Sequence, residues 1–301
     1  MLQVGIFTAY FPYALEETAR RIRALGFNTV QLDLSFKDMD LADEHITSEN
    51  CRKIRETFRR YDLPICAVSG YTNLIHPDPD RRKQNHKRLK RIIQHARELG
   101  TPYVISETGT FDPDSDWVHH PKNKTKEGYA ECRDAIGAMV QAASNYGAVF
   151  CVETYVNNVI GSVEETLKLF SQIPDPCLGL LMDPTNYFED HNIDDMDKTL
   201  DHIFDALSDD IKIAHAKDVK RAEEDKGVQM ADIDAGEGHA LRGVGKIELP
   251  PPGLGSLNYD LYLQRLSREH PNISIVIEHL DETDVPRAKQ FLDEKLIANR
   301  C

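Results

Sequence analysis

The sequence predicts an α/β fold, a (β/α)₈ TIM barrel that forms a single domain over residues 1–301. Short apolar, β-branched runs alternate eight times with longer segments of helical period, as expected for parallel strands buried on both faces. The length also suits eight β/α units. No GxGxxG pattern surrounds Gly5 in the first run, so a dinucleotide-binding open sheet is less favoured.

Each element is expected where its pattern is strongest. Gly26 and Gly100 occupy C-cap positions after the first and third helices, whereas Ser48 begins the second helix with Cys51 where a capping box would have Glu. The expected strands are Gln3–Phe7, Thr29–Leu34, Ile65–Ser69, Tyr103–Ser106, Val149–Thr154, Leu178–Met182, Ile211–His215 and Ile273–Ile277. The expected helices are Leu15–Ala24, Ser48–Tyr61, Arg81–Leu99, Lys126–Tyr146, Val163–Ser171, Met196–Leu207, Tyr259–Arg268 and Val285–Ala298.

One segment interrupts the regular alternation. Residues 221–255 are polar and rich in Gly and Pro, and they follow the seventh strand. Loops after barrel strands lie on the C-terminal face, where barrel active sites are found, so we interpret this segment as a long loop that covers the substrate. A disordered insertion is the alternative.

Composition limits the partners. The chain has 36 Lys and Arg against 50 Asp and Glu, a net charge of −14, which disfavours nucleic acid and anionic membrane surfaces. Six cysteines show no disulfide or metal spacing and fit a reducing cytoplasm. The first strand leaves no room for a signal peptide ahead of it, and no apolar run approaches the roughly 20 residues of a membrane helix.

Four consecutive strands end on a metal-binding residue type. The fifth to eighth apolar runs stop at Glu153, Asp183, His215 and Glu278. The C-terminal ends of neighbouring barrel strands meet at the mouth, so these side chains are expected to converge. Three carboxylates and one imidazole suit Mn²⁺, with Mg²⁺, Co²⁺ or Zn²⁺ as alternatives.

The simpler explanation is that each residue is a helix cap or a solvated strand end. This explanation suits any one of them but not four in succession, because three unpaired carboxylates in one mouth would repel each other strongly. The pattern therefore favours one divalent metal ion.

These motifs resemble the xylose-isomerase-like TIM barrels, which include sugar and sugar-phosphate isomerases and epimerases. The resemblance rests on Val152–Thr154, Met182–Asn186, His215–Asp218, Ile277–His279 and the segment Gly253–Tyr259, and its eight-strand layout covers the chain. It implies that Glu153 and Glu278 bind metal and move the proton, while Asp183 and His215 only bind metal.

The resemblance also suggests substrate contacts. Arg221 lies six residues after His215, where an arginine contacts substrate oxygens in the ketose 3-epimerase branch, although a solvated loop residue is an equal alternative. Asn186 departs from the family, in which many members have His at this place. Because Asn cannot accept a proton and binds metal weakly, we expect it to donate or accept hydrogen bonds with the substrate.

Further substrate-binding candidates come from the residues themselves. Glu107 closes the fourth strand, and Asp33 and His76 are expected at the mouth; for each, a structural hydrogen bond is the alternative. Trp117 would stack on a sugar face or anchor its loop. Lys217 shares the face of His215 and would contact substrate or pair with an acidic neighbour.

The leading hypothesis is a metal-dependent isomerase or epimerase of a sugar or sugar phosphate, working through a metal-stabilised enediolate. The alternative is a lyase or dehydratase of a keto-sugar, keto-inositol or oxidised glycoside, which Asn186 mildly favours. A nuclease like endonuclease IV is a third possibility, but it would need more histidines and a basic surface. A sugar-binding protein that has lost turnover is a fourth, and it would keep the four metal-binding residue types at the strand ends. Barrels of this kind often pair, so a homo-oligomer is also considered.

Overall fold

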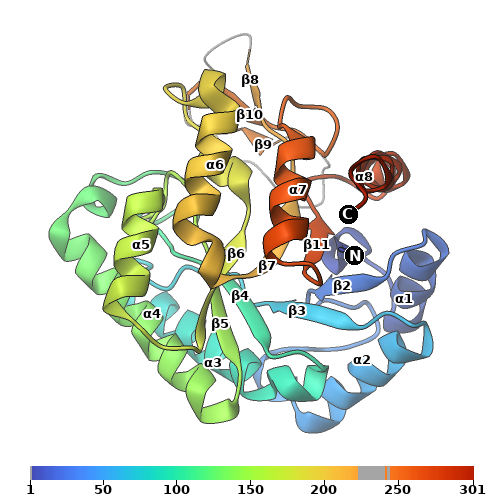
Figure 1. Ribbon diagram of the computed structural model, residues 1–301. Coiled ribbons are helices and arrows are strands. Elements are labelled where there is room, and N and C mark those ends of the chain that lie inside the picture. Colours follow the sequence, from blue (N-terminus) through green and yellow to red (C-terminus); the bar gives the residue numbers. More distant parts are fainter. Residues whose placement is uncertain (1, 223–240, 243–244) are drawn as a thin grey trace.

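Eight parallel strands close into a barrel in the computed structural model, which describes residues 2–222, 241–242 and 245–301. The order around the barrel is β1-β11-β7-β6-β5-β4-β3-β2, and the ring closes because β1 pairs with both β2 and β11. Figure 1 shows the helices arranged outside the strands. The predicted (β/α)₈ fold is confirmed.

The barrel strands begin and end within a few residues of the predicted limits. The second strand is shorter than expected and stops before Asp33, while the fourth continues to Glu107. The barrel strands are β1 (Gln3–Phe7), β2 (Thr29–Leu32), β3 (Ile65–Ser69), β4 (Tyr103–Glu107), β5 (Val149–Glu153), β6 (Leu178–Met182), β7 (Ile211–Ala216) and β11 (Ser274–Ile277).

The helices carry recognisable end signals. Thr47 caps the second helix by accepting a hydrogen bond from the Asn50 amide, so the cap lies one residue before Ser48. Gly100 is the C-cap of α3 with a φ of 104°, whereas the C-cap of α1 is Leu25 and Gly26, with a φ of 82°, is the residue after it. The helices are α1 (Leu15–Ala24), α2 (Ser48–Arg60), α3 (Pro79–Leu99), α4 (Lys126–Tyr146), α5 (Val163–Gln172), α6 (Met196–Leu207), α7 (Tyr259–Glu269) and α8 (Val285–Asn299).

The long excursion after β7 is present, and its described residues include three short strands among turns and irregular chain. β8 (Lys220–Arg221), β10 (Ile247–Leu249) and β9 (Leu241–Arg242) form an antiparallel sheet in that order. Figure 1 shows this sheet near α6 and α7. Most of the predicted substrate-covering segment, residues 223–240 and 243–244, lies outside the described residues, so that role stays a prediction.

A layer of small and branched side chains fills the barrel. It contains Ala67, Ile105, Cys151, Leu181, Ile213 and Val276, one from each of six strands. Side chains alternate between the two faces of a strand, so residues two positions further along also point inward. Glu153, Asp183, His215 and Glu278 each lie two residues after a member of this layer, which directs all four side chains into the barrel at its C-terminal end.

Asp218 fixes the chain as it returns to the barrel. Its Oδ1 accepts hydrogen bonds from the Val219 amide (2.8 Å) and the Leu257 amide (2.9 Å), and its Oδ2 accepts one from the Gly253 amide (2.9 Å). A Cβ on Gly255 would lie 2.2 Å from Asp218 Oδ1, so the clamp also requires glycine there. Asp218 therefore holds the segment before α7 against the end of β7.

All six cysteines are free thiols. No helix in the described part of the chain is both long and apolar enough to span a membrane.

We predict that Asp218→Asn lowers the free energy of unfolding by about 2 kcal/mol, because an NH₂ group replaces one acceptor and leaves buried amides unpaired. Urea unfolding followed by circular dichroism measures the change. The control Asp209→Asn alters an exposed carboxyl and should stay within about 0.5 kcal/mol of the parent protein. Equal effects of the two substitutions would contradict the clamp.

Candidate metal centre

The four predicted ligands meet at the barrel mouth. Glu153 ends β5, Asp183 directly follows β6, His215 lies in β7, and Glu278 directly follows β11. One ligand atom from each residue lies within 4.8 Å of the others, and all four side chains are buried. The convergence expected from four consecutive strands is confirmed; the metal and catalytic roles of these residues remain predictions.

The orientation of the imidazole suits a metal ligand. His215 Nε2 lies 2.8 Å from Gln31 Oε1, which can only accept, so Nε2 carries a hydrogen. Nδ1 then faces Glu278 Oε1 at 3.2 Å and Glu153 Oε1 at 3.6 Å, yet it is buried without a hydrogen bond. A ring nitrogen surrounded by carboxylates needs a proton or a cation between them.

Lys217 supplies one positive charge to the cluster. Its ammonium lies 2.6 Å from Asp183 Oδ2 and 3.4 Å from Glu278 Oε1, and the side chain is buried. Lys217 therefore pairs with acidic neighbours, which is one of the two roles expected from the sequence. Direct contact of Lys217 with substrate stays a prediction.

Asn186 connects two members of the site. Its Nδ2 donates to Glu153 Oε1 (2.9 Å), and its Oδ1 accepts from Lys217 Nζ (2.7 Å). Both ends of the amide are engaged by side chains in this structure. The observed contacts orient Glu153 and Lys217, and the predicted hydrogen bond to substrate stays a prediction.

Burial and charge shift the protonation equilibria in the cluster. Burial raises the pKa of Asp183 to about 6, although Lys217 opposes the rise. Burial lowers the pKa of His215, but the Glu278 and Glu153 carboxylates outweigh burial and raise it to about 10. In the absence of a metal, the cluster therefore holds a proton on His215 near neutral pH.

Two contacts of the cluster escape sequence reasoning. The Tyr71 hydroxyl donates to Glu153 Oε2, and Gln31 orients His215. Gln31 is a polar residue inside the apolar second strand, and Tyr71 lies two residues after Ser69, the last residue of β3. The alternation of side chains between the two faces of a strand could have placed both inside the barrel. No apolar run ends on either residue, and the strand-end pattern therefore misses both.

Glu107 reaches the mouth but does not join the cluster. It ends β4, pairs in register with Glu153, and is 1% exposed. Neither of its carboxyl oxygens has a hydrogen-bond partner. Burial, together with the nearby Asp116 and Glu153 carboxylates, holds the pKa of Glu107 well above its usual range.

Two other candidates have structural partners. His76 Nδ1 accepts from the Asp78 amide (3.1 Å) and its Nε2 lies 3.2 Å from the Pro113 carbonyl, so both ring nitrogens join loop backbone. Asp33 accepts from the Ser35 hydroxyl directly after β2. These contacts match the structural alternative for each residue.

Trp117 belongs to a row of aromatic rings beside the cluster. Its ring centroid lies 6.4 Å from that of Tyr71 and 6.1 Å from that of Tyr155, and Phe7 lies 6.3 Å from Tyr71. Trp117 is half-buried and the row extends from β1 to the end of β5. This position is compatible with both the stacking and the anchoring interpretation.

Arg221 points to a different group of carboxylates. Its Nη2 lies 2.9 Å from Asp194 Oδ2 and donates to the Asp190 carbonyl at 3.1 Å. The guanidinium is exposed and holds β8 to the loop after β6. The structure does not bring Arg221 into the metal-ligand cluster, and its contacts agree with a surface loop role.

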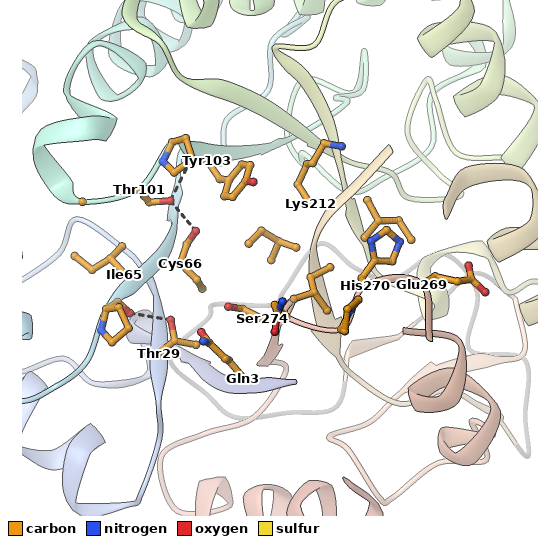
Figure 2. Close-up of a pocket in the computed structure, with 18 residues that line it drawn as sticks. Gln3, Thr29, Ile65, Cys66, Thr101, Tyr103, Lys212, Glu269, His270 and Ser274 are labelled. Atoms are coloured by element: carbon orange, nitrogen blue, oxygen red, sulfur yellow. Dashed lines mark hydrogen bonds between the residues drawn. The ribbon is translucent and has the colours of Figure 1, made fainter. Parts of the chain in front are cut away.

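A cavity of about 570 Å³ opens at the opposite end of the barrel, where the strands begin. Figure 2 shows Gln3, Thr29, Tyr103 and Ser274 around it. Two of its hydroxyl groups have protein partners: that of Thr29 donates to the Pro64 carbonyl (2.8 Å), and that of Thr101 donates to the Cys66 carbonyl (2.7 Å). Among the described residues that line this cavity, none has a buried polar atom without a partner, in contrast to the mouth.

The chain resembles several solved structures in fold. A D-tagatose 3-epimerase-like protein has a TM-score of 0.70 at 17% identity, covering 99% of this chain and 98% of that one. The probable 3-DHS dehydratase AsbF from Bacillus anthracis has a TM-score of 0.69 at 16% identity, covering 100% of both chains. The IOLI protein with a bound zinc atom has a TM-score of 0.66 at 15% identity, covering 99% and 98%. No curated protein matches the chain in sequence.

Identities this low establish a shared fold and not a shared reaction. The sequence itself gives the closer relationship, since residues 19–295 match the family described as xylose isomerase-like TIM barrel. The closed barrel and the buried acidic cluster at its mouth agree with that match. The chain therefore belongs to the xylose isomerase-like TIM barrel family.

Proposed function

We propose that this chain is a divalent-metal-dependent isomerase or epimerase of a sugar-like ketone or aldehyde. The observation that supports the proposal most directly is the buried His215 Nδ1, which faces three carboxylates without a hydrogen bond. Such a donor set fits a carboxylate-rich site for Mn²⁺, with Mg²⁺, Co²⁺ and Zn²⁺ as alternatives. The zinc bound by the structurally similar IOLI protein adds support for a metal in this fold.

Glu153, Asp183, His215 and Glu278 would hold the ion. When bound, a divalent cation would polarise a substrate carbonyl and stabilise the negative charge that develops as a neighbouring C–H bond loses its proton. The protein must then supply a group to take the proton and a group to return it.

The strand order places the two glutamates on opposite sides of the cluster. Glu153 is on β5 and Glu278 follows β11, with β6 and β7 between them. A substrate held between the glutamates would meet one carboxylate on each face. Glu153 would take the proton from carbon. Glu278 would first take up a proton from solvent and would then deliver it to the other face, which inverts that carbon, and loss of the Glu153 proton to solvent would restore both carboxyl groups.

The two glutamates are supported differently. Tyr71 and Asn186 each donate to one oxygen of Glu153, so its carboxylate has a fixed orientation. Glu278 faces cationic partners, His215 at 3.2 Å and Lys217 at 3.4 Å, and their charges hold its pKa well below its usual range despite burial. Fixed orientation suits proton abstraction from a defined position.

A lyase or dehydratase is the second candidate. Elimination needs an acid near the leaving hydroxyl, and the Lys217 ammonium lies at the edge of the cluster. The structural similarity to the probable dehydratase AsbF is compatible with this chemistry. Both candidates share the first proton transfer and differ in whether a hydroxyl group is lost.

We predict that Glu153→Gln and Glu278→Gln each reduce turnover by about 10²- to 10⁴-fold, because each removes a proton carrier and a charge beside the metal. Ketoses, their phosphates and keto-glycosides are incubated with Mn²⁺ in D₂O, and NMR follows deuterium incorporation next to the carbonyl. Retention of every hydroxyl indicates isomerisation or epimerisation, whereas loss of one indicates elimination.

The matched control is Glu164→Gln, an exposed glutamate on α5, which should leave turnover unchanged. Metal content is measured on every variant, so that loss of the ion is distinguished from loss of proton transfer. A protein that binds no divalent metal, together with full turnover in Glu153→Gln, would refute the proposal.

We also predict that Gln31→Leu weakens Mn²⁺ affinity by about 10- to 100-fold. Gln31 Oε1 accepts a hydrogen bond from His215 Nε2 and so orients the ring with Nδ1 toward the carboxylates. Competition with a fluorescent chelator measures the affinity. Gln264→Leu, on the exposed face of α7, is the control and should bind Mn²⁺ like the parent protein. Equal affinity in all three proteins would show that Gln31 does not support a metal ligand.

A further inference from the structure

Glu107 is a buried carboxyl group that the proposed reaction does not use. It lies two residues after Ile105 of the inner layer, so its side chain points into the barrel at the end of β4. It is 1% exposed, and both carboxyl oxygens are buried without a hydrogen-bond partner. A carboxyl group with neither solvent nor partner is rare in a folded protein and calls for a specific explanation.

The metal cluster does not provide that explanation. Glu107 is not among the four residues whose ligand atoms come together, although it pairs in register with Glu153 on the next strand. The charged groups that act on it most strongly, Asp116 and Glu153, are both acidic. Neither can donate a hydrogen bond to a carboxylate, so the hydrogen-bonding capacity of both Glu107 oxygens is unused by the described residues.

The neighbouring surface is aromatic. Tyr71 bonds to Glu153, and the ring of Trp117, which directly follows Asp116, lies between the rings of Tyr71 and Tyr155. Largely apolar walls with a few convergent polar groups are typical of small-molecule sites. The aromatic row supplies apolar groups and Glu107 a polar group close to the β4 and β5 ends of the barrel.

The spacing connects this surface to the reaction site. Adjacent strands lie about 4.8 Å apart, so a group on β4 is within a few carbon–carbon bonds of a carbonyl held at the β5 side of the cluster. A carboxyl group offers two oxygens side by side, which match hydroxyl groups on adjacent carbons.

We propose that Glu107 is a specificity-determining residue whose carboxyl group binds two adjacent hydroxyl groups of the substrate, away from the reacting carbonyl. The proposal rests on the proposed function and narrows its substrate class to molecules with a remote vicinal diol. A site built to bond substrate hydroxyls rejects analogues that lack them, because its buried polar group would stay unpaired.

The test compares two ketones in wild type and Glu107→Leu. D-Fructose and its epimers at C3 and C4 carry vicinal diols beyond the carbonyl, whereas 1,3-dihydroxyacetone does not. Mn²⁺-dependent deuterium exchange gives kcat/KM for each. We expect the ratio of the six-carbon ketose to dihydroxyacetone to fall by about 100-fold or more in the variant. An unchanged ratio would overturn the proposal.

Stability separates binding from a structural role. Replacing an unpartnered buried carboxyl with an apolar side chain should not lower Tm, whereas loss of a structural residue would lower it. Tyr129→Phe, which removes another buried polar atom without a partner, on α4 outside the barrel, is the matched control and should leave the ratio unchanged. A drop in Tm confined to Glu107→Leu would contradict the proposal.

Trp117 keeps this test independent of turnover. It is the only tryptophan in the sequence, so its fluorescence reports ligand binding at the aromatic row. If wild type exchanges none of the ketones, the proposed function fails, but binding of the six-carbon ketoses still tests Glu107. We expect binding to wild type and at least about tenfold weaker binding to Glu107→Leu. No response from wild type, or equal binding, would overturn the inference.

Discussion

The mouth of this barrel depends on how three buried carboxylates are balanced by positive charge. Glu153, Asp183 and Glu278 face one another without solvent, and Lys217 neutralises only part of their charge. In the absence of a metal, a proton on His215 supplies a second positive charge. A divalent ion with neutral His215 and charged Lys217 would balance the three carboxylates fully. Binding the ion would therefore displace the His215 proton, which couples metal affinity to pH.

The supporting residues follow from this balance. A ligand that must exchange a proton for a metal needs a fixed tautomer, and Gln31 fixes it from a strand on the other side of the barrel. The carboxylates need fixed orientations, and Asn186 joins Glu153 to Lys217 so that anion and cation are positioned together. Behind them, Asp218 holds the return segment against the end of β7. The cluster is thus supported by contacts between distant parts of the chain.

Sequence reasoning recovered what depends on local pattern. Apolar runs predicted the eight strands, and the polar residue at the end of each of four runs predicted the cluster, because strand ends in a barrel converge regardless of sequence separation. The contacts of Gln31 and Tyr71 were missed, since His215 lies 184 residues from Gln31 and Glu153 lies 82 from Tyr71. The small sheet was missed because strands of two or three residues carry no periodicity. Substrate contact by Arg221 stays a prediction, while its contacts with Asp190 and Asp194 agree with the loop alternative and depend on a loop conformation that no motif specifies.

The two ends of the barrel differ in how their buried polar groups are satisfied. At the end where the strands begin, Thr29 and Thr101 donate to neighbouring carbonyls, and the His270 ring lies within hydrogen-bond distance of Ser208. At the mouth, His215 Nδ1 and both oxygens of Glu107 have no hydrogen-bond partner. Unsatisfied buried groups destabilise a fold, and a ligand that completes them offsets this cost. None of the described residues that line the cavity in Figure 2 has a buried polar atom without a partner. The unpaired groups at the mouth include His215 Nδ1, which suits a cation, and the Glu107 oxygens, which suit hydroxyl groups, as the proposed metal-dependent enzyme with a polyhydroxylated substrate would require.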